Sequence, residues 1–308
     1  MPLHVETPLL QSRALSLASG RKVWLKLESL QPSGSFKLRG IGLACETYHA
    51  EGARRFVCSS SGNAGLAVAY AGRALSVPVT VVVPTTATER AKELLRSEGA
   101  EVIVHGASWQ EANELATSQV GASDAFLHPF DDRLVWEGHA TMIDEAARSG
   151  VRPDAVLLSV GGGGLLCGVA QGMERNGWSE VPILAVETEG AASFHAATIA
   201  GRPVEIPAIT SIASSLGARK VAERAVRWWK ERPVQSLVVS DRSALLACER
   251  FLTDQRLLIE PSCGTSLALV YERAPELEPF GTVLVIVCGG ATATIDQIRE
   301  WLALQCQR

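Results

Sequence analysis

The chain has 308 residues, of which 47% are hydrophobic, so it can form a large core and is long enough for about two domains. Its formal net charge of −4 comes with no basic block, which excludes the usual surface of a nucleic-acid-binding protein. The longest apolar runs, at 79–84 and 282–288, are too short to cross a bilayer, and no secretion signal precedes them. We therefore expect a cytoplasmic protein with no nucleic-acid or membrane partner.

The cysteines indicate a reducing environment. There are seven, at positions 45, 58, 167, 248, 263, 288 and 306. The number is odd, no C-x-x-C pair occurs, and several of them stand inside apolar runs, as reduced buried thiols do. The sequence supports neither a disulfide framework nor a zinc site.

In chain order, short runs rich in β-branched residues alternate with segments whose apolar residues recur at helical spacing. The expected strands are 22–28, 55–60, 79–84, 100–105, 155–160, 182–187, 236–240 and 282–288. The expected helices include 64–75, 89–98, 109–118 and 221–231. This alternation predicts an α/β protein with parallel sheets, in which ligands bind beyond the carboxyl ends of strands.

The segment QPSGSFKLRG, residues 31–40, places Lys37 after Phe36 in a turn of small residues that opens onto an apolar helical run. A lysine in such a position is usually a solvated residue at the start of a helix. The alternative is a desolvated lysine that loses its proton and acts as a Schiff-base nucleophile. This segment alone does not decide between the two readings.

Four consecutive glycines, Gly161 to Gly164, follow one expected strand and precede a helical run. Without side chains, their backbone amides can converge on an anion at the start of a helix. The dinucleotide pattern G-x-G-x-x-G fails because Leu166 or Cys167 occupies the third glycine position, and the lysine of a P-loop is absent. A single phosphate ester fits this loop better, although four glycines can also form a flexible linker.

Two further loops follow expected strands. The segment SSSGNAG, residues 59–65, combines hydroxyls, a flexible glycine and the amide of Asn63, which together can bind a carboxylate and an aromatic hydroxyl. The alternative is an ordinary serine-rich helix cap. The segment CGGATAT, residues 288–294, begins with Cys288, which could equally be a core cysteine.

Together, SGSFKLRG, SSSGNAG, SVGGGGL and the late CGG resemble the fold type II pyridoxal-phosphate enzymes, and most closely the serine dehydratase branch. The segments PFDDRLVWEGHAT, SFHAAT and IEPSCG add to this resemblance, which spans nearly the whole chain. It implies a fold like that of the tryptophan synthase β subunit. It also implies a small α/β domain of residues 32–131, a large cofactor-binding domain of residues 1–31 and 132–308, and a homodimer.

The resemblance also assigns roles to individual residues. By the matching motifs, Lys37 forms the Schiff base with pyridoxal phosphate and moves the substrate's Cα proton, while Phe36 packs near the cofactor ring. Asn63 binds the ring hydroxyl, Cys288 faces the ring nitrogen, and the backbone amides of Gly161, Gly162, Gly163 and Gly164 bind the phosphate. Ser60, Ser61 and Asn63 hold the substrate carboxylate.

The implied reaction is β-elimination, which converts L-serine to pyruvate and ammonia and L-threonine to 2-oxobutyrate. A thiol at Cys288 cannot keep the ring nitrogen fully protonated, which favours elimination over transamination. Ser61 departs from the residue usual in animal dehydratases and resembles that of serine racemases, where it serves as the second acid/base group. A racemase or another lyase therefore stays an alternative, as does a non-enzymatic protein that binds a nucleotide-like ligand.

The resemblance further implies a monovalent-cation site. Its ligands would be the carboxylate of Glu187 and backbone oxygens of Ala191, Leu216 and Ala218, a hard-oxygen set suited to K⁺. The alternative is that Glu187, at the end of an expected strand, is only a surface or capping residue.

Overall fold

The computed structural model describes residues 1–305 of the chain. The strands are β1 (Leu9–Gln11), β2 (Lys22–Lys26), β3 (Arg55–Cys58), β4 (Val79–Val83), β5 (Glu101–Val104), β6 (Asp124–Phe126), β7 (Ala155–Ser159), β8 (Ile183–Thr188), β9 (Val234–Val239) and β10 (Thr282–Ile286). The helices are α1 (Arg13–Ser19), α2 (Lys37–Ala50), α3 (Asn63–Leu75), α4 (Glu89–Ser97), α5 (Trp109–Ser118), α6 (Arg133–Arg148), α7 (Gly164–Arg175), α8 (Ser193–Ala200), α9 (Glu223–Glu231), α10 (Asp241–Gln255), α11 (Pro261–Tyr271) and α12 (Ile295–Gln305).

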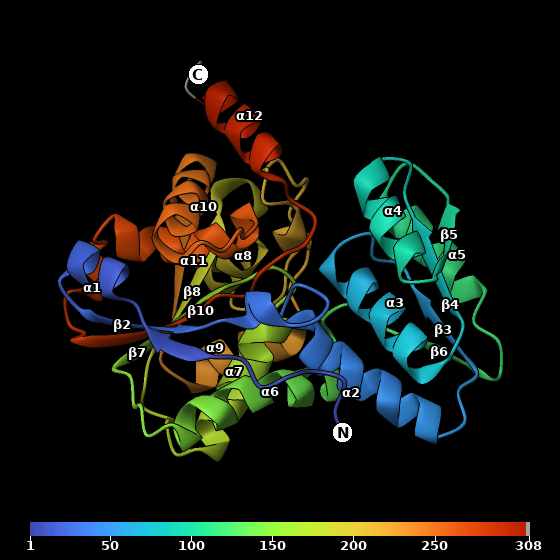
Figure 1. The fold of residues 1–308 in the computed structure, drawn as a ribbon, viewed down its shortest axis with the longest axis horizontal. Coiled ribbons are helices and arrows are strands. Elements are labelled where there is room, and N and C mark those ends of the chain that lie inside the picture. The colour runs from blue at the N-terminus through green and yellow to red at the C-terminus, as the bar shows by residue number, and fades with distance from the viewer. Residues whose placement is uncertain (306–308) are drawn as a thin grey trace.

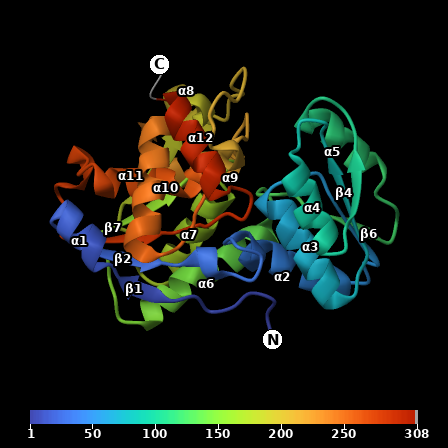
Figure 2. The same ribbon diagram turned by 45° about the horizontal axis from the view of Figure 1, so that its top comes forward.

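The strands form two separate sheets (Figure 1). The larger sheet has the order β1-β2-β10-β7-β8-β9, and its strands are parallel except for the β1–β2 pair. Helices α10 and α11 lie on one side of it, and α6 and α7 lie on the other (Figures 1 and 2). Every residue of β7 and β8 is buried, as expected for strands covered by helices on both faces.

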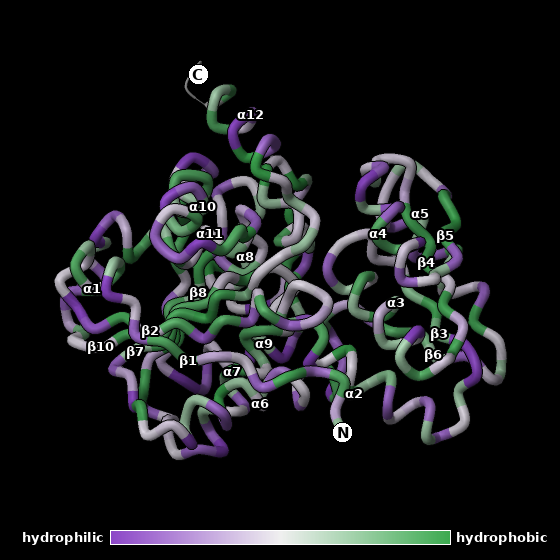
Figure 3. The backbone as a smooth tube through the Cα atoms, in the orientation of Figure 1, coloured by the Kyte–Doolittle hydropathy of each residue, from purple (hydrophilic) through white to green (hydrophobic). Residues whose placement is uncertain are grey.

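The smaller sheet has the order β5-β4-β3-β6 and is parallel throughout. Side chains alternate between its two faces. Phe56 and Val81 belong to the apolar cluster that includes α2 and α3 residues, whereas Val57 and Val82 pack with α5. The hydrophobic segments of both sheets lie inside the molecule and the hydrophilic ones mostly outside (Figure 3).

Helix α2 connects the two halves because it packs on α3 on one side and on α6 on the other. The crossing of α2 and α6 is very close. A Cβ added at Gly40 would lie 2.3 Å from the Val135 carbonyl oxygen, and one at Gly138 would lie 2.2 Å from the Arg39 carbonyl oxygen. These two glycines therefore let the backbones of α2 and α6 touch.

The α/β architecture with parallel sheets confirms the fold class expected from the sequence, and each expected strand and helix is present within a few residues. Two strands were not expected, β1 and β6. Each has only three residues, which is too short for a periodic pattern, and each pairs at a sheet edge with a strand supplied by tertiary contacts.

Six cysteines, all except Cys306, are buried and free, as the sequence predicts; Cys306 lies outside the described residues. Among residues 1–305, no helix has the length and apolar character needed to cross a bilayer.

Candidate active site

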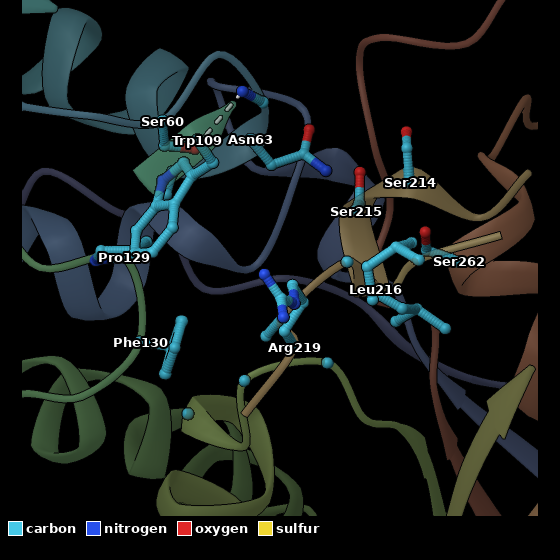
Figure 4. Close-up of a pocket in the computed structure, with 18 of the residues that line it drawn as sticks. Ser60, Asn63, Trp109, Pro129, Phe130, Ser214, Ser215, Leu216, Arg219 and Ser262 are labelled. Atoms are coloured by element: carbon cyan, nitrogen blue, oxygen red, sulfur yellow. Dashed lines mark hydrogen bonds between the residues drawn. The ribbon is translucent and has the colours of Figure 1, made fainter. Parts of the chain in front are cut away.

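A cavity of about 1400 Å³ lies between the two sheets and is lined by loops from both. Figure 4 shows Ser60, Asn63 and Trp109 on one side of it and Ser214, Ser215, Leu216 and Ser262 on the other. The loops lie at the carboxyl ends of the parallel strands, where open α/β sheets bind ligands. The sequence pointed to these same loops.

Lys37 is the first residue of α2, and its side chain lines the cavity. Its Nζ donates a hydrogen bond of 2.6 Å to the Pro129 carbonyl oxygen and lies 5.1 Å from the centre of the Phe36 ring. Burial lowers the pKa of Lys37 from 10.5 to about 8, although the neighbouring thiols of Cys288 and Cys58 and the Glu260 carboxylate oppose the shift. The solvated reading of Lys37 is therefore wrong, and the amine can lose its proton near neutral pH.

Backbone hydrogen bonds hold the Lys37 turn against the CGG loop. The Phe36 N–H donates to the Cys288 carbonyl oxygen at 3.1 Å, and the Gly290 N–H donates to the Gly34 carbonyl oxygen at 2.9 Å. Residues some 250 positions apart thereby share one wall of the cavity. The sequence showed each loop, but only the fold shows that they are neighbours.

Asn63 links the SSSGNAG loop to the opposite side of the cavity. Its Nδ2 donates to Oε1 of Glu260 at 2.6 Å, and its Oδ1 accepts from the Ala291 N–H at 3.2 Å. Because a carboxylate accepts only, these two contacts fix which end of the amide faces which partner. Of the two Nδ2 hydrogens, one remains for a ligand in the cavity.

Glu260 is the important site residue that sequence analysis did not assign. Its carboxyl is buried, accepts from Asn63 and also accepts from the Thr292 hydroxyl at 3.0 Å. Burial raises its pKa, while the hydrogen bonds and the charge of Lys37 counteract this. A glutamate directly before Pro261 at the start of α11 was the available signal, but a Glu–Pro helix start looks the same on a protein surface.

The loop Gly161 to Gly164 lines the cavity and leads into α7. In the part of the chain that the structure describes, none of these four glycines donates its backbone N–H to another backbone or side-chain acceptor. A Cβ at Gly162 would lie 2.3 Å from the Phe130 ring, and Gly163 adopts φ +91°, which favours glycine. The loop is thus a cradle of free amide donors at a helix start, as a phosphate requires.

Cys288 lines the cavity directly below the Lys37 turn and is nearly buried. A hydrogen bond with the Cys263 thiol, together with burial, raises the pKa of Cys288 well above its ordinary value, so the thiol is neutral.

Ser60 and Ser61 also line the cavity, and the Ser60 hydroxyl accepts from the Gly62 N–H at 3.3 Å. Ser59 does not face the cavity, since its hydroxyl donates to Asn113.

These residues fit pyridoxal phosphate: a buried amine with a lowered pKa, a free amide cradle for a phosphate, a fixed amide for a ring hydroxyl and a neutral thiol all open onto one cavity. Each of these features was named from the sequence, and the structure brings all of them together.

The expected cation ligands lie apart from this group, and only Leu216 and Ala218 line the cavity. Glu187 is the second-to-last residue of β8, is fully buried, and accepts from the N–H groups of Phe194 and His195 at 2.8 and 2.7 Å. Burial raises the pKa of Glu187 to about 8. Glu187 is therefore not a surface residue, but it does cap the first turn of α8, as the alternative interpretation allowed. A Cβ at Gly161 would lie 3.0 Å from the Leu216 Cα, so the two regions adjoin.

Comparisons with known proteins agree with this site. The family described as "Pyridoxal-phosphate dependent enzyme" matches residues 1–289. The chain is 48% identical to a Homo sapiens L-serine dehydratase/L-threonine deaminase, over 97% of this chain and 94% of that protein. Its fold is similar to a fungal L-serine ammonia-lyase from Rhizomucor miehei (TM-score 0.92, 35% identity, 98% of each chain) and to a serine racemase from Dictyostelium discoideum (TM-score 0.84, 26% identity, 94% of each chain).

The resemblance to the serine dehydratase branch is thus confirmed by relatives that match nearly the whole chain, and a protein that only binds a nucleotide-like ligand is excluded. With its family match, its two-sheet fold and a lysine and a glycine cradle that line the same cavity, this chain belongs to the pyridoxal-phosphate dependent enzymes of fold type II.

Proposed function

We propose that this chain catalyses the β-elimination of L-serine to pyruvate and ammonia, and of L-threonine to 2-oxobutyrate. The observation that carries the proposal is the Lys37 amine, buried at the cavity with a pKa of about 8, in a chain 48% identical to an L-serine dehydratase/L-threonine deaminase. When bound, pyridoxal phosphate draws electron density from the Cα–H bond of an attached amino acid and makes that proton acidic.

Lys37 accepts this proton. At a pH near 8 a large fraction of its amine is neutral and can act as a base, and the Pro129 carbonyl oxygen, 2.6 Å from Nζ, orients it. Ser60, Ser61 and Asn63 hold the substrate carboxylate from the opposite loop, which aims Cα at Lys37. Phe36 would pack at the ring of bound pyridoxal phosphate, and Asn63 would donate to the ring hydroxyl.

Cys288 would face the ring nitrogen of bound pyridoxal phosphate. Its raised pKa keeps the thiol neutral, so it offers one weak hydrogen bond and no charge. Such a partner would leave the ring nitrogen largely unprotonated, which would favour elimination of the β-hydroxyl over transamination.

A purified-protein assay tests the proposal directly. L-serine should yield pyruvate, detected by coupled oxidation of NADH, and Lys37→Ala should abolish turnover while circular dichroism and the melting temperature stay unchanged. Lys22→Ala, an exposed lysine on β2, serves as the matched control and should keep full activity. Pyruvate formation by Lys37→Ala above background would refute the role of Lys37.

We also propose the K⁺ site at Glu187, Ala191, Leu216 and Ala218. Its support is the burial of Glu187 and the nearby Ser193 hydroxyl, which is buried and has no hydrogen-bond partner among residues 1–305. A hard cation held by these oxygens would balance the buried charge of Glu187 and give the Ser193 hydroxyl a partner. Activity and melting temperature should be higher in KCl than in LiCl at equal ionic strength, and Glu187→Gln should remove the difference.

Serine racemisation is the second candidate activity, because Ser61 lines the same cavity as Lys37. Racemisation needs an acid/base group on each face of the planar carbanion, and Lys37 serves only one. L-serine should yield mostly pyruvate with a small fraction of D-serine, and Ser61→Ala should remove the D-serine and largely spare pyruvate. If chiral chromatography finds no D-serine from wild type, Ser61 only binds the carboxylate.

Three properties of the whole protein complete the proposal. The small domain comprises residues 32–131, and the large domain comprises residues 1–31 and 132–308, of which 306–308 lie outside the described range. This division is supported by the four-stranded sheet, because all of its strands fall within residues 55–126. The protein is a cytoplasmic homodimer. Free buried cysteines support the compartment, and sedimentation analysis tests the dimer.

A further inference from the structure

His139 is a buried histidine next to Lys37 that the proposed reaction does not use. It belongs to α6, is 0% exposed, and lies where α2, α6 and α7 meet. A Cβ at Gly168 would lie 2.4 Å from the His139 Cβ, and one at Gly40 would lie 2.7 Å from its ring carbon Cε1. The ring position is therefore fixed by packing on two sides.

The hydrogen bond of His139 defines its tautomer. The Gly40 N–H donates to Nδ1 at 3.2 Å, so Nδ1 carries no proton and the ring proton resides on Nε2. Burial lowers the pKa of His139 well below 6.5, and the charges of Lys37, Arg39 and His4, which face it from α2 and the N-terminal segment, lower it further. Nε2 has no hydrogen-bond partner within residues 1–305. The centre of the His139 ring lies 4.8 Å from the centre of the Phe36 ring.

Helix α2 needs this acceptor because it begins without a side-chain cap. Phe36 stands at the cap position, and its apolar side chain cannot accept from the first N–H groups. The Leu38 and Arg39 N–H groups reach the Ser35 and Phe36 carbonyl oxygens at 3.3 and 3.0 Å, and the Gly40 N–H is left for His139. A side chain from α6 thus caps the helical turn that begins with Lys37.

We propose that His139 is a positioning residue for Lys37: its neutral ring caps the first turn of α2 and supports Phe36, which together fix the direction in which the lysine side chain leaves the helix. His139 does not line the cavity, so it acts through the turn rather than on the substrate. The proposal rests on the proposed function only in taking Lys37 as the reactive lysine.

Two substitutions separate the two contacts of the ring. His139→Phe keeps a ring against Phe36 but removes the acceptor, whereas His139→Asn places an amide oxygen near the position of Nδ1 but removes the ring. For His139→Phe we expect kcat to fall about ten- to hundredfold with little change in KM, as for a displaced catalytic group. His139→Asn should recover most of this loss.

Two readouts do not depend on turnover. In holoenzyme, the pH midpoint of the visible cofactor absorbance reports the environment of the Lys37 nitrogen. This midpoint should shift in His139→Phe and return toward the wild-type value in His139→Asn. In apoenzyme and holoenzyme alike, amide hydrogen exchange of a peptide covering residues 36–44 should be faster in His139→Phe only. Both readouts remain valid even if the protein does not act on serine.

Ile143→Ala, another fully buried residue one turn along α6, is the control for general loss of packing. It should lower the melting temperature without moving the absorbance midpoint or the exchange at 36–44. Equal shifts in the control, or wild-type kcat and exchange in His139→Phe, overturn the proposal.

If His139→Phe does not fold, the wild-type protein provides the test. Nitrogen NMR of histidine-labelled enzyme should show Nδ1 unprotonated and Nε2 protonated between about pH 6 and 9. A proton on Nδ1 in this range contradicts the cap.

Discussion

Lys37 shows how burial alone can change the chemistry of one side chain. Its amine has one close hydrogen-bond acceptor, the Pro129 carbonyl oxygen, and no carboxylate within salt-bridge distance among residues 1–305. Desolvation therefore dominates and lowers its pKa to about 8, whereas Lys26, which is fully buried, forms an ion pair with Glu145. The same residue type is reactive in one place and structural in the other.

The pKa of Lys37 predicts the pH dependence of cofactor capture by apoenzyme. Only the neutral amine attacks an aldehyde, so the second-order rate should rise about tenfold per pH unit below pH 8 and become constant above it. Stopped-flow absorbance after adding pyridoxal phosphate measures this rate. A rate that continues to rise to pH 10.5, the ordinary lysine value, would show that the amine is solvated.

Glu260 is the second residue whose environment predicts a measurable effect. Glu260→Ala leaves the Asn63 Nδ2 without its buried acceptor, which costs about 1–3 kcal/mol, so cofactor affinity should fall about tenfold or more. Glu260→Gln keeps an oxygen for Asn63 and should lose less. Equilibrium titration of the apoenzymes with pyridoxal phosphate gives both affinities, and equal affinity of wild type and Glu260→Ala would mean that Asn63 does not need this partner.

At the scale of elements, the loop between β7 and α7 depends on the absence of side chains. Its glycines lie against the Phe130 ring, the Leu216 backbone and Val221, so there is no space for a methyl group on any of them. The close packing holds the loop, with its free amides, in one position. The flexible linker, which was the alternative interpretation of this glycine run, is excluded because the run is tightly packed.

Gly162→Ala tests this loop. The added Cβ would lie 2.3 Å from the Phe130 ring, so either the ring or the loop must move and the amide cradle is distorted. We expect cofactor affinity to fall at least about tenfold by the loss of one or two charge-assisted hydrogen bonds. Gly281→Ala is the control, because its Cβ would meet only Asp154 at 3.4 Å, an ordinary contact. Equal affinities in the two variants would contradict a rigid cradle.

At the scale of the whole molecule, a buried ion cluster of Lys26, Glu28, Arg39 and Glu145 joins β2, α2 and α6. Arg39 donates to Glu28 at 2.7 Å and to Glu145 at 2.6 Å, and the Arg39 and Glu28 side chains are 0% exposed. Two positive and two negative charges balance inside the protein. The cluster fixes α2, which carries Lys37, against the large sheet.

Removing Arg39 should destabilise the fold as a whole. Arg39→Ala leaves the buried Glu28 carboxylate without its ion-pair partner and leaves Glu145 with Lys26 alone, which should lower the free energy of unfolding by about 3–5 kcal/mol in urea titrations. Arg148→Ala, which breaks the exposed pair with Glu6, should cost less than about 1 kcal/mol and is the matched control. Similar losses in the two variants would mean that the cluster is solvated in solution.

The cluster also gives stability a pH dependence. Burial alone would raise the pKa of Glu145, but Arg39 and Lys26 outweigh it and hold the pKa below 4.5. The contribution of Glu145 to the free energy of unfolding is therefore fully present above the ordinary carboxyl pKa. It is lost as the pH falls through the lowered pKa of Glu145 in the folded protein.

Much of this arrangement was predictable because its signals are local. Alternating β-branched runs and helical patterns identified the α/β class, and the order of SGSFKLRG, SSSGNAG, SVGGGGL and CGG identified the family and the residues that meet at the cavity. These signals depend on backbone sterics and turn chemistry within a few residues, which a chain carries wherever it folds.

Burial and partnership depend on residues far apart in the chain and were decided only by tertiary structure. The sequence could not decide whether Lys37 is solvated. It also could not show that the Glu260 carboxylate accepts from Asn63 Nδ2 at 2.6 Å, 197 positions away, or that His139 accepts from Gly40 in the first turn of α2, 99 positions away. The short edge strands β1 and β6 likewise exist only because a neighbouring strand pairs with them. A pKa or a hydrogen bond is set by the atoms that surround a group in space, so the sequence named the reactive residues and the packing made them reactive.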